Sequence, residues 1–104
     1  MRRMGVLCTF ALIAPLFAAP PAPACPKALL DDATRDYASG QYALAIAKAR
    51  WCTAAEPSVA YRVIGASSCF LKDRATALDA WTHLDSQGRN FVKYVCLRND
   101  IKIP

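Results

Sequence analysis

The feature that most restricts the fold is a set of four cysteines, Cys25, Cys52, Cys69 and Cys96, which follows an apolar N-terminal segment. The fifth cysteine, Cys8, lies inside that segment, so an even number remains, as is typical of two disulfides in a small exported protein. Four cysteines permit three pairings. The chain of 104 residues can hold one small domain, whose core is close to the smallest that is stable without cross-links. The sequence has no Cys-x-x-Cys motif and its only histidine is His83, so neither a zinc site nor a thioredoxin-like redox motif is expected.

The N-terminal segment has the layout of a secretory signal peptide. Two arginines precede a charge-free apolar stretch over residues 5–19, and Ala22 and Ala24 are suitable small residues for a cleavage site. We therefore expect residues 1–24 to be a signal peptide that is cleaved after Ala24. The remaining protein is expected to be periplasmic or secreted.

Two alternatives concern attachment to a membrane. The apolar stretch contains Pro15 and is shorter than the roughly 20 residues that a spanning helix needs, so no membrane span is expected after processing. A lipid anchor at Cys25, as in bacterial lipoproteins, stays open. It is not favoured, because Pro23 lies close to the expected cleavage site and the usual aliphatic residue is missing at position 22.

Residues 25–104 are predicted to form a single all-α domain of two antiparallel helical hairpins plus a C-terminal helix. This part has few glycines and is rich in Ala, Leu, Arg and Lys, which favours helix. Ser39-Gly40, Glu56-Pro57 and Ser86-Gly88 are expected to separate helices, and Ser58 is expected to cap the third one. We expect helices from Pro26 to Ser39, Tyr42 to Ala54, Val59 to Leu71, Thr76 to about Asp85, and Phe91 to Leu97.

The last of these segments is ambiguous between helix and strand. Its β-branched residues suit a strand, but polar and apolar residues do not alternate and no partner strand is expected, so helix is favoured. Asn99 and Asp100 are expected to turn the chain. Ile101 and Ile103 are then expected to fold back onto the helices.

The sequence contains an internal repeat, in which similar residues recur at one fixed spacing along the chain. The related pairs are Leu29 and Tyr61, Ala33 and Gly65, Ala45 and Ala77, Ala49 and Trp81, and Cys52 and Leu84. Units of two antiparallel helices, with small residues where the backbones approach, are typical of α-solenoids.

These residues resemble the tetratricopeptide repeat. The stretch from Gly40 to Ile46, followed by Ala49 and Pro57, is similar to the second half of that motif. The next unit has matching residues at Tyr61, Ile64, Gly65, Ala77 and Trp81, whereas Asp32, Ser68 and Arg74 depart from the pattern.

The resemblance implies a small exported bacterial protein with degenerate tetratricopeptide-like units over residues 28–57 and 58–86. A C-terminal helix over residues 89–98 would follow them. The ending of the chain, from Arg89 to Ile103, also resembles repeat-like domains of myxobacteria.

The expected helix layout selects one of the three disulfide pairings. In an antiparallel hairpin the start of the first helix lies beside the end of the second, which places Cys25 next to Cys52. The third and fifth helices run in the same direction, and Cys69 and Cys96 both lie late in them. We therefore expect Cys25–Cys52 and Cys69–Cys96.

Motifs of catalysis are missing from the sequence, which has no nucleophile elbow, zinc-binding helix or phosphate-binding loop. His83 falls on the polar face of its helix, and Asp31 and Asp32 stand near a helix start, where acidic residues are common. We expect no enzymatic activity, no cofactor and no metal. Among the aromatic residues, core positions are expected for Phe70, Trp81, Phe91 and Tyr94. Trp51 is expected to be either exposed off the packing face of its helix or partly buried against the C-terminal tail.

The repeat reading predicts a groove for a protein or peptide partner, because the first helices of successive units line one face of a solenoid. The alternative is that the C-terminal helix covers this face. The residues expected in the groove are Lys27, Asp31, Thr34, Tyr37, Arg62 and Ala66.

The predicted function is that of a non-catalytic interaction or scaffold module of the bacterial envelope or extracellular space. The alternative is a small cationic secreted factor that binds membranes or anionic polymers through Arg89, Lys93, Arg98 and Lys102. Nucleic acid is not expected as a partner, because Asp100 interrupts these basic residues and no aromatic residues alternate with them to stack on bases.

Overall fold

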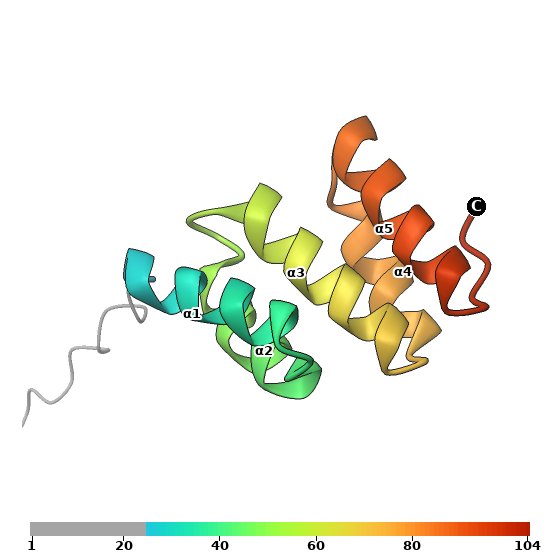
Figure 1. Cartoon of the computed structure of the whole chain (residues 1–104). Coiled ribbons are helices and arrows are strands. Elements are labelled where there is room, and N and C mark those ends of the chain that lie inside the picture. Colours follow the sequence, from blue (N-terminus) through green and yellow to red (C-terminus); the bar gives the residue numbers. More distant parts are fainter. Residues whose placement is uncertain (1–24) are drawn as a thin grey trace, which may run out of the picture.

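The computed structural model describes residues 25–104, which form five α-helices and, within that range, no strand. The elements are α1 (Lys27–Ala38), α2 (Tyr42–Ala49), the 3-10 helix η2 (Arg50–Cys52), α3 (Pro57–Phe70), α4 (Arg74–Thr82) and α5 (Ser86–Arg98). Helix α3 lies in the middle, with α1 and α2 on one side and α4 and α5 on the other (Figure 1). The predicted all-α fold is confirmed. The expected signal peptide lies outside the described residues, and among residues 25–104 no helix is long and apolar enough to cross a membrane.

A tight turn joins α1 and α2 into the first hairpin. Gly40 has a φ of +84° in this turn, a left-handed conformation that glycine adopts without steric cost. Ala45 and Ala49 of α2 are fully buried, so the small side chains let the two helices approach closely. An ion pair of 2.8 Å between Lys48 and Asp36 links the helices beside this contact.

Helix α2 is shorter than the sequence predicts. The expected helix extends to Ala54, but the α-helix ends at Ala49 and continues as the 3-10 helix η2. Tighter 3-10 turns are common at helix ends. This one brings the fully buried Cys52 to Cys25, and the two Cα atoms are 5.0 Å apart.

Helix α3 is the most deeply buried element, because helices pack against it from both sides. Every residue from 63 to 69 is buried, and most of these side chains are small. At Gly65 a β-carbon would lie 2.8 Å from Cγ2 of Val92, so α5 packs directly against the backbone of α3. The small side chains of α3 therefore allow α5 to pack close to its backbone.

The start of α3 differs from the prediction. Pro57 was expected to end the previous helix and Ser58 to cap the next, but Pro57 is itself the first residue of α3. Proline suits this position, because the first turn of a helix has no acceptor for its N–H group and proline's φ is already helical.

The boundaries of α4 and α5 are set by two aspartates. Asp73 accepts a hydrogen bond of 3.1 Å from the backbone N–H of Thr76, and Asp85 accepts one of 2.9 Å from that of Gly88. The expected stop at Ser86–Gly88 is wrong, because these residues form the first turn of α5, and the expected helix over 89–98 starts three residues too late. The preference for helix over strand in this segment is confirmed.

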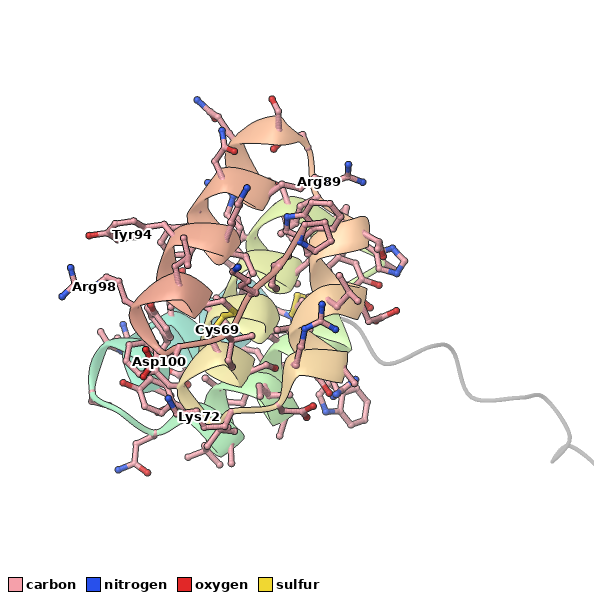
Figure 2. All side chains as sticks on the ribbon, turned by 90° about the vertical axis from the view of Figure 1, so that its right-hand side faces the viewer. Cys69, Lys72, Arg89, Tyr94, Arg98 and Asp100 are labelled. Carbon is pink, nitrogen blue, oxygen red and sulfur yellow. A yellow bond between two sulfur atoms is a disulfide. The ribbon has the colours of Figure 1, made fainter. Side chains whose placement is uncertain are left out.

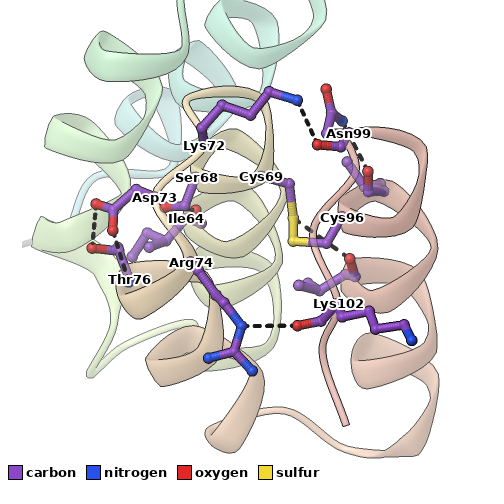
Figure 3. Close-up of a disulfide and its surroundings, with 12 residues drawn as sticks. Ile64, Ser68, Cys69, Lys72, Asp73, Arg74, Thr76, Cys96, Asn99 and Lys102 are labelled. Atoms are coloured by element: carbon purple, nitrogen blue, oxygen red, sulfur yellow. Dashed lines mark hydrogen bonds between the residues drawn. A yellow bond between two sulfur atoms is a disulfide. The ribbon is translucent and has the colours of Figure 1, made fainter.

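Both predicted disulfides are present. Cys69 and Cys96 join α3 to α5, with their Cα atoms 4.6 Å apart (Figure 3). Beyond α5 the chain folds back as predicted, with Ile101 and Ile103 buried. Arg74 Nε donates a hydrogen bond of 2.9 Å to the carbonyl oxygen of Lys102, which fixes this tail across the start of α4 (Figure 3).

The Asp73 cap predicts a pH-dependent stability difference. Hydrogen bonds from the Thr76 hydroxyl and backbone N–H lower the pKa of the Asp73 carboxyl. The stabilisation is therefore complete above the ordinary carboxyl pKa of about 4 and is lost as the pH falls through the lowered value. We expect Asp73→Ala to reduce the free energy of unfolding by about 1 kcal/mol at pH 7, and by less below about pH 3.

Thermal unfolding between pH 2 and 7 measures this difference. Asp73→Asn is the matched control, since asparagine also caps helices but does not titrate. Its stability relative to Asp73→Ala should stay constant with pH. If the difference in stability between the wild type and Asp73→Ala is also constant with pH, the ionised carboxylate of Asp73 does not have the proposed capping role.

Candidate functional site

Three adjoining hollows form a continuous groove across α1, α3 and α5. The first, about 290 Å³, lies between α1 and the start of α3 and includes Lys27, Asp31 and Thr34. The second, about 200 Å³, includes Thr34 and Tyr37 of α1, Arg62 of α3 and Phe91 of α5. We call this surface the α1–α3–α5 groove.

The third hollow extends the groove along α5. It has a volume of about 390 Å³ and is lined by Tyr37, Phe70, Phe91, Tyr94 and Arg98, among others. Because Tyr37 and Phe91 also line the second hollow, the two are continuous. Helix α5 therefore forms the third wall of the groove, beside α1 and α3. It does not cover the groove, which was the alternative considered from the sequence.

The structure places most of the predicted groove residues together. Lys27, Asp31 and Thr34 lie in the first hollow, and Tyr37 and Arg62 lie in the second. Ala66 is an error of the prediction: it is fully buried in the core beneath α5. Ala66 lies one helical turn after Arg62, where the side chains of α5 already pack over α3.

The aromatic walls of the groove were not predicted from the sequence. Phe70 and Phe91 are each 39 % exposed and Tyr94 is 59 % exposed, so all three predicted core positions are wrong. Val92, Val95 and Cys96 form the buried face of α5. The sequence does indicate this second, exposed face of the helix, because residues 91, 94 and 98 follow helical spacing along it.

The remaining aromatic predictions have mixed outcomes. Trp51 is 55 % exposed, which matches the first of the two alternatives for this residue. Trp81 is half-buried, with the guanidinium of Arg89 lying 4.5 Å from its ring centroid.

Aromatic side chains stack on one another at the end of the groove. The rings of Tyr42 and Phe70 are parallel with centroids 4.4 Å apart, and Tyr37 packs edge-on at 5.9 Å and 6.0 Å from them. Burial, together with the neighbouring Tyr42, raises the pKa of the Tyr37 phenol. The Tyr37 phenol is thus uncharged at physiological pH.

Charges are unevenly distributed along the groove. Lys27 and Asp31 at one end form an exposed pair of 3.3 Å, and Glu56 also lines that hollow. Arg62 and Arg98 lie in the other two hollows. The first hollow therefore carries two carboxylates and one ammonium group, whereas the second and third hollows carry one guanidinium group each.

The two arginines have few acidic partners. The nearest carboxylate to Arg62 is Asp85, at 3.9 Å from Nη2, and the buried Nε has no hydrogen-bond acceptor among residues 25–104. Arg98 forms no ion pair within the described part of the chain, and its Nη1 donates to the Tyr94 hydroxyl at 3.1 Å. Figure 2 shows Tyr94 and Arg98 projecting side by side from α5.

The C-terminal basic residues do not form one continuous stripe. Arg89 donates hydrogen bonds of 3.1 Å to the carbonyl oxygens of Trp81 and Thr82 at the end of α4. It lies on the opposite side of α5 from Arg98 (Figure 2). Arg89 therefore fixes α5 to α4, whereas Arg98 faces the groove.

His83 lies outside the groove. It is exposed, its ring is parallel to that of Tyr61 with centroids 4.2 Å apart, and its Nε2 is 3.9 Å from Asp79. Across residues 25–104, no three His, Cys, Asp or Glu side chains are grouped so that they could hold a metal ion.

Comparisons with protein-family models, with curated proteins and with solved structures find no match to this chain. The resemblance to the tetratricopeptide repeat therefore stays a prediction from the sequence. What this site can do follows from its geometry: it is an elongated groove with aromatic walls and two guanidinium groups along it, a combination suited to holding an elongated ligand.

Proposed function

We propose that this protein is a non-catalytic interaction module that binds a segment of a partner protein in the α1–α3–α5 groove. The observation that carries the proposal is the exposure of Phe70, Phe91 and Tyr94 along one continuous groove. Exposed aromatic side chains gathered in a concavity are typical of protein interaction sites, where they supply most of the binding energy.

The construction of the walls supports the same function. The groove is built on helices, and the Cys69–Cys96 disulfide fixes α5 against α3. The stacked Tyr42 and Phe70 hold each other in place. A groove that is preformed on packed and cross-linked helices is expected to lose little conformational entropy on binding, which favours affinity.

The proposed setting is the periplasm or the extracellular space. Two disulfides in a chain with a predicted signal peptide support this location, since disulfides persist in oxidising compartments. The proposed role is that of an interaction or scaffold module of a bacterial envelope, as the repeat resemblance implies.

A photo-crosslinking experiment in the exporting cell tests the groove. A photoreactive phenylalanine analogue replaces Tyr94, which is 59 % exposed in the groove, or Trp51, which is 55 % exposed outside it. We expect a discrete adduct from position 94 and none of the same mass from position 51. Phe91→Ala should reduce the adduct at position 94 several-fold, because it removes the adjoining wall.

Two results would contradict the proposal. One is the same adduct pattern from both positions, which would indicate indiscriminate contact. The other is an adduct at position 94 that Phe91→Ala leaves unchanged while the variant stays folded by thermal unfolding.

A further inference from the structure

We propose that the occupant of the α1–α3–α5 groove is an acidic peptide segment in which a large apolar side chain is flanked by carboxylates. The apolar side chain would sit between Tyr37 and Phe91, with the carboxylates at Arg62 and Arg98. This inference rests on the proposed function, and specifies the partner's chemistry.

The middle hollow defines the apolar position. Its surface is almost wholly apolar and is provided by Val59, Val63, Tyr37 and Phe91, with Arg62 as its only charged side chain. A volume of about 200 Å³ accommodates one large aliphatic or aromatic side chain. Burial of such a side chain against two aromatic rings provides the non-polar part of the binding.

Arg62 defines the first acidic position. Asp85, its nearest carboxylate, already accepts the hydrogen bond of 2.9 Å that caps α5, and its distance of 3.9 Å from Arg62 exceeds that of a hydrogen bond. A ligand carboxylate would give this guanidinium the bidentate partner that the folded chain does not.

Arg98 defines the second acidic position, on the other side of the apolar hollow. It contributes one hydrogen bond to Tyr94 and has no ion pair within the described residues. Its guanidinium lies 5.7 Å from the Tyr94 ring centroid, which fixes its position at the groove edge.

The charges at the opposite end of the groove determine which part of it an acidic ligand occupies. Asp31 and Glu56 outnumber Lys27 there, so this end repels carboxylates and phosphates. An acidic segment therefore binds over α3 and α5. A nucleic-acid strand running the length of the groove would place phosphates against Asp31 and Glu56, and the same charges disfavour it.

Selection of displayed random peptides on the oxidised, exported protein tests this inference. We expect enriched sequences to carry Asp or Glu on both sides of Phe, Tyr, Trp or Leu. The strongest binder is then titrated as a fluorescent peptide, together with a copy in which its acidic residues are replaced by their amides. The amide copy should bind wild-type protein at least tenfold more weakly, because charge-assisted hydrogen bonds to arginine are lost.

Variants of the protein connect this preference to the two arginines. Arg62→Gln and Arg98→Gln should each weaken binding of the acidic peptide about tenfold and affect the amide copy much less. Arg50→Gln, an exposed arginine that lines none of the three hollows, is the matched control and should change affinity less than twofold. Thermal unfolding of each variant verifies that it is folded.

The outcomes separate this inference from the proposed function. If selected peptides are neutral or basic but lose affinity in Phe91→Ala, the groove binds peptides and the acidic preference is wrong. If no selected peptide responds to Phe91→Ala, or single-stranded DNA binds more tightly than any peptide, both proposals fall. If the acidic peptide binds equally to wild type, Arg62→Gln and Arg98→Gln, the assignment of the carboxylates is wrong.

Discussion

Replacing Cys69 and Cys96 together by alanine is expected to lower the free energy of unfolding by about 3 kcal/mol or more. The disulfide closes a loop with a sequence separation of 27, and restricting a loop of that size in the unfolded chain is worth about 3 kcal/mol in the chain-entropy model. Both sulfur atoms are also buried in the core between α3 and α5, so alanine leaves a cavity as well. Denaturant unfolding of the oxidised protein and the variant measures the difference.

The pair Cys25 and Cys52 is the matched control, because its sequence separation is also 27. Its entropic contribution is therefore equal, but Cys25 is only half-buried at the start of the described chain. We expect the alanine variant of this pair to lose less stability than that of the central pair. Equal losses would show that loop closure alone matters, and a loss below about 1 kcal/mol at Cys69–Cys96 would contradict the proposed role of the disulfide in fixing α5.

The disulfide pairing was predictable because it depends only on the order and direction of the helices. A first hairpin places Cys25 beside Cys52 wherever the exact helix ends lie. Helices α3 and α5 run in the same direction, and Cys69 and Cys96 lie near their C-terminal ends, so they meet at the same level. Errors of a few residues in the boundaries leave this relationship unchanged.

The helix boundaries were less predictable, because they depend on side-chain hydrogen bonds that composition does not show. Gly88 suggests a helix stop, yet it lies in the first turn of α5 because Asp85 caps that turn. A β-carbon at Gly88 would lie 2.9 Å from Cδ2 of Leu84, so the glycine also lets the chain fold tightly against the residues that precede it. Asp73 sets the start of α4 in the same way, earlier than Thr76.

The groove was partly predictable for a similar reason. The α1 side of the groove follows from helical spacing, and Lys27, Asp31, Thr34 and Tyr37 lie along it. The α5 side required knowing which of two apolar faces packs inward. Buried side chains in this protein are mostly small, and the larger rings of Phe91 and Tyr94 remain outside. The core positions predicted for Phe91 and Tyr94 are wrong because the largest apolar side chains do not fill this core.

The same preference for small core residues predicts a strong effect of enlarging Ala45 or Ala77. Ala45 is fully buried in the core that α1, α2 and α3 share, and Ala77 is fully buried in the core that α3, α4 and α5 share. Leucine at either position forces the helices apart, and we expect a loss of about 1–3 kcal/mol in the free energy of unfolding. In a domain of this size, that corresponds to a fall in Tm of at least about 4 °C.

Ala43→Leu is the matched control, since Ala43 is exposed on α2, the same helix as Ala45. Alanine and leucine have similar helix propensities, so this variant should change stability by less than about 0.5 kcal/mol. Thermal unfolding of the three oxidised variants gives the comparison. If Ala45→Leu and Ala77→Leu are as stable as Ala43→Leu, the helices have room to spare at both sites, and the constant offset that relates Ala45 to Ala77 has no basis in packing.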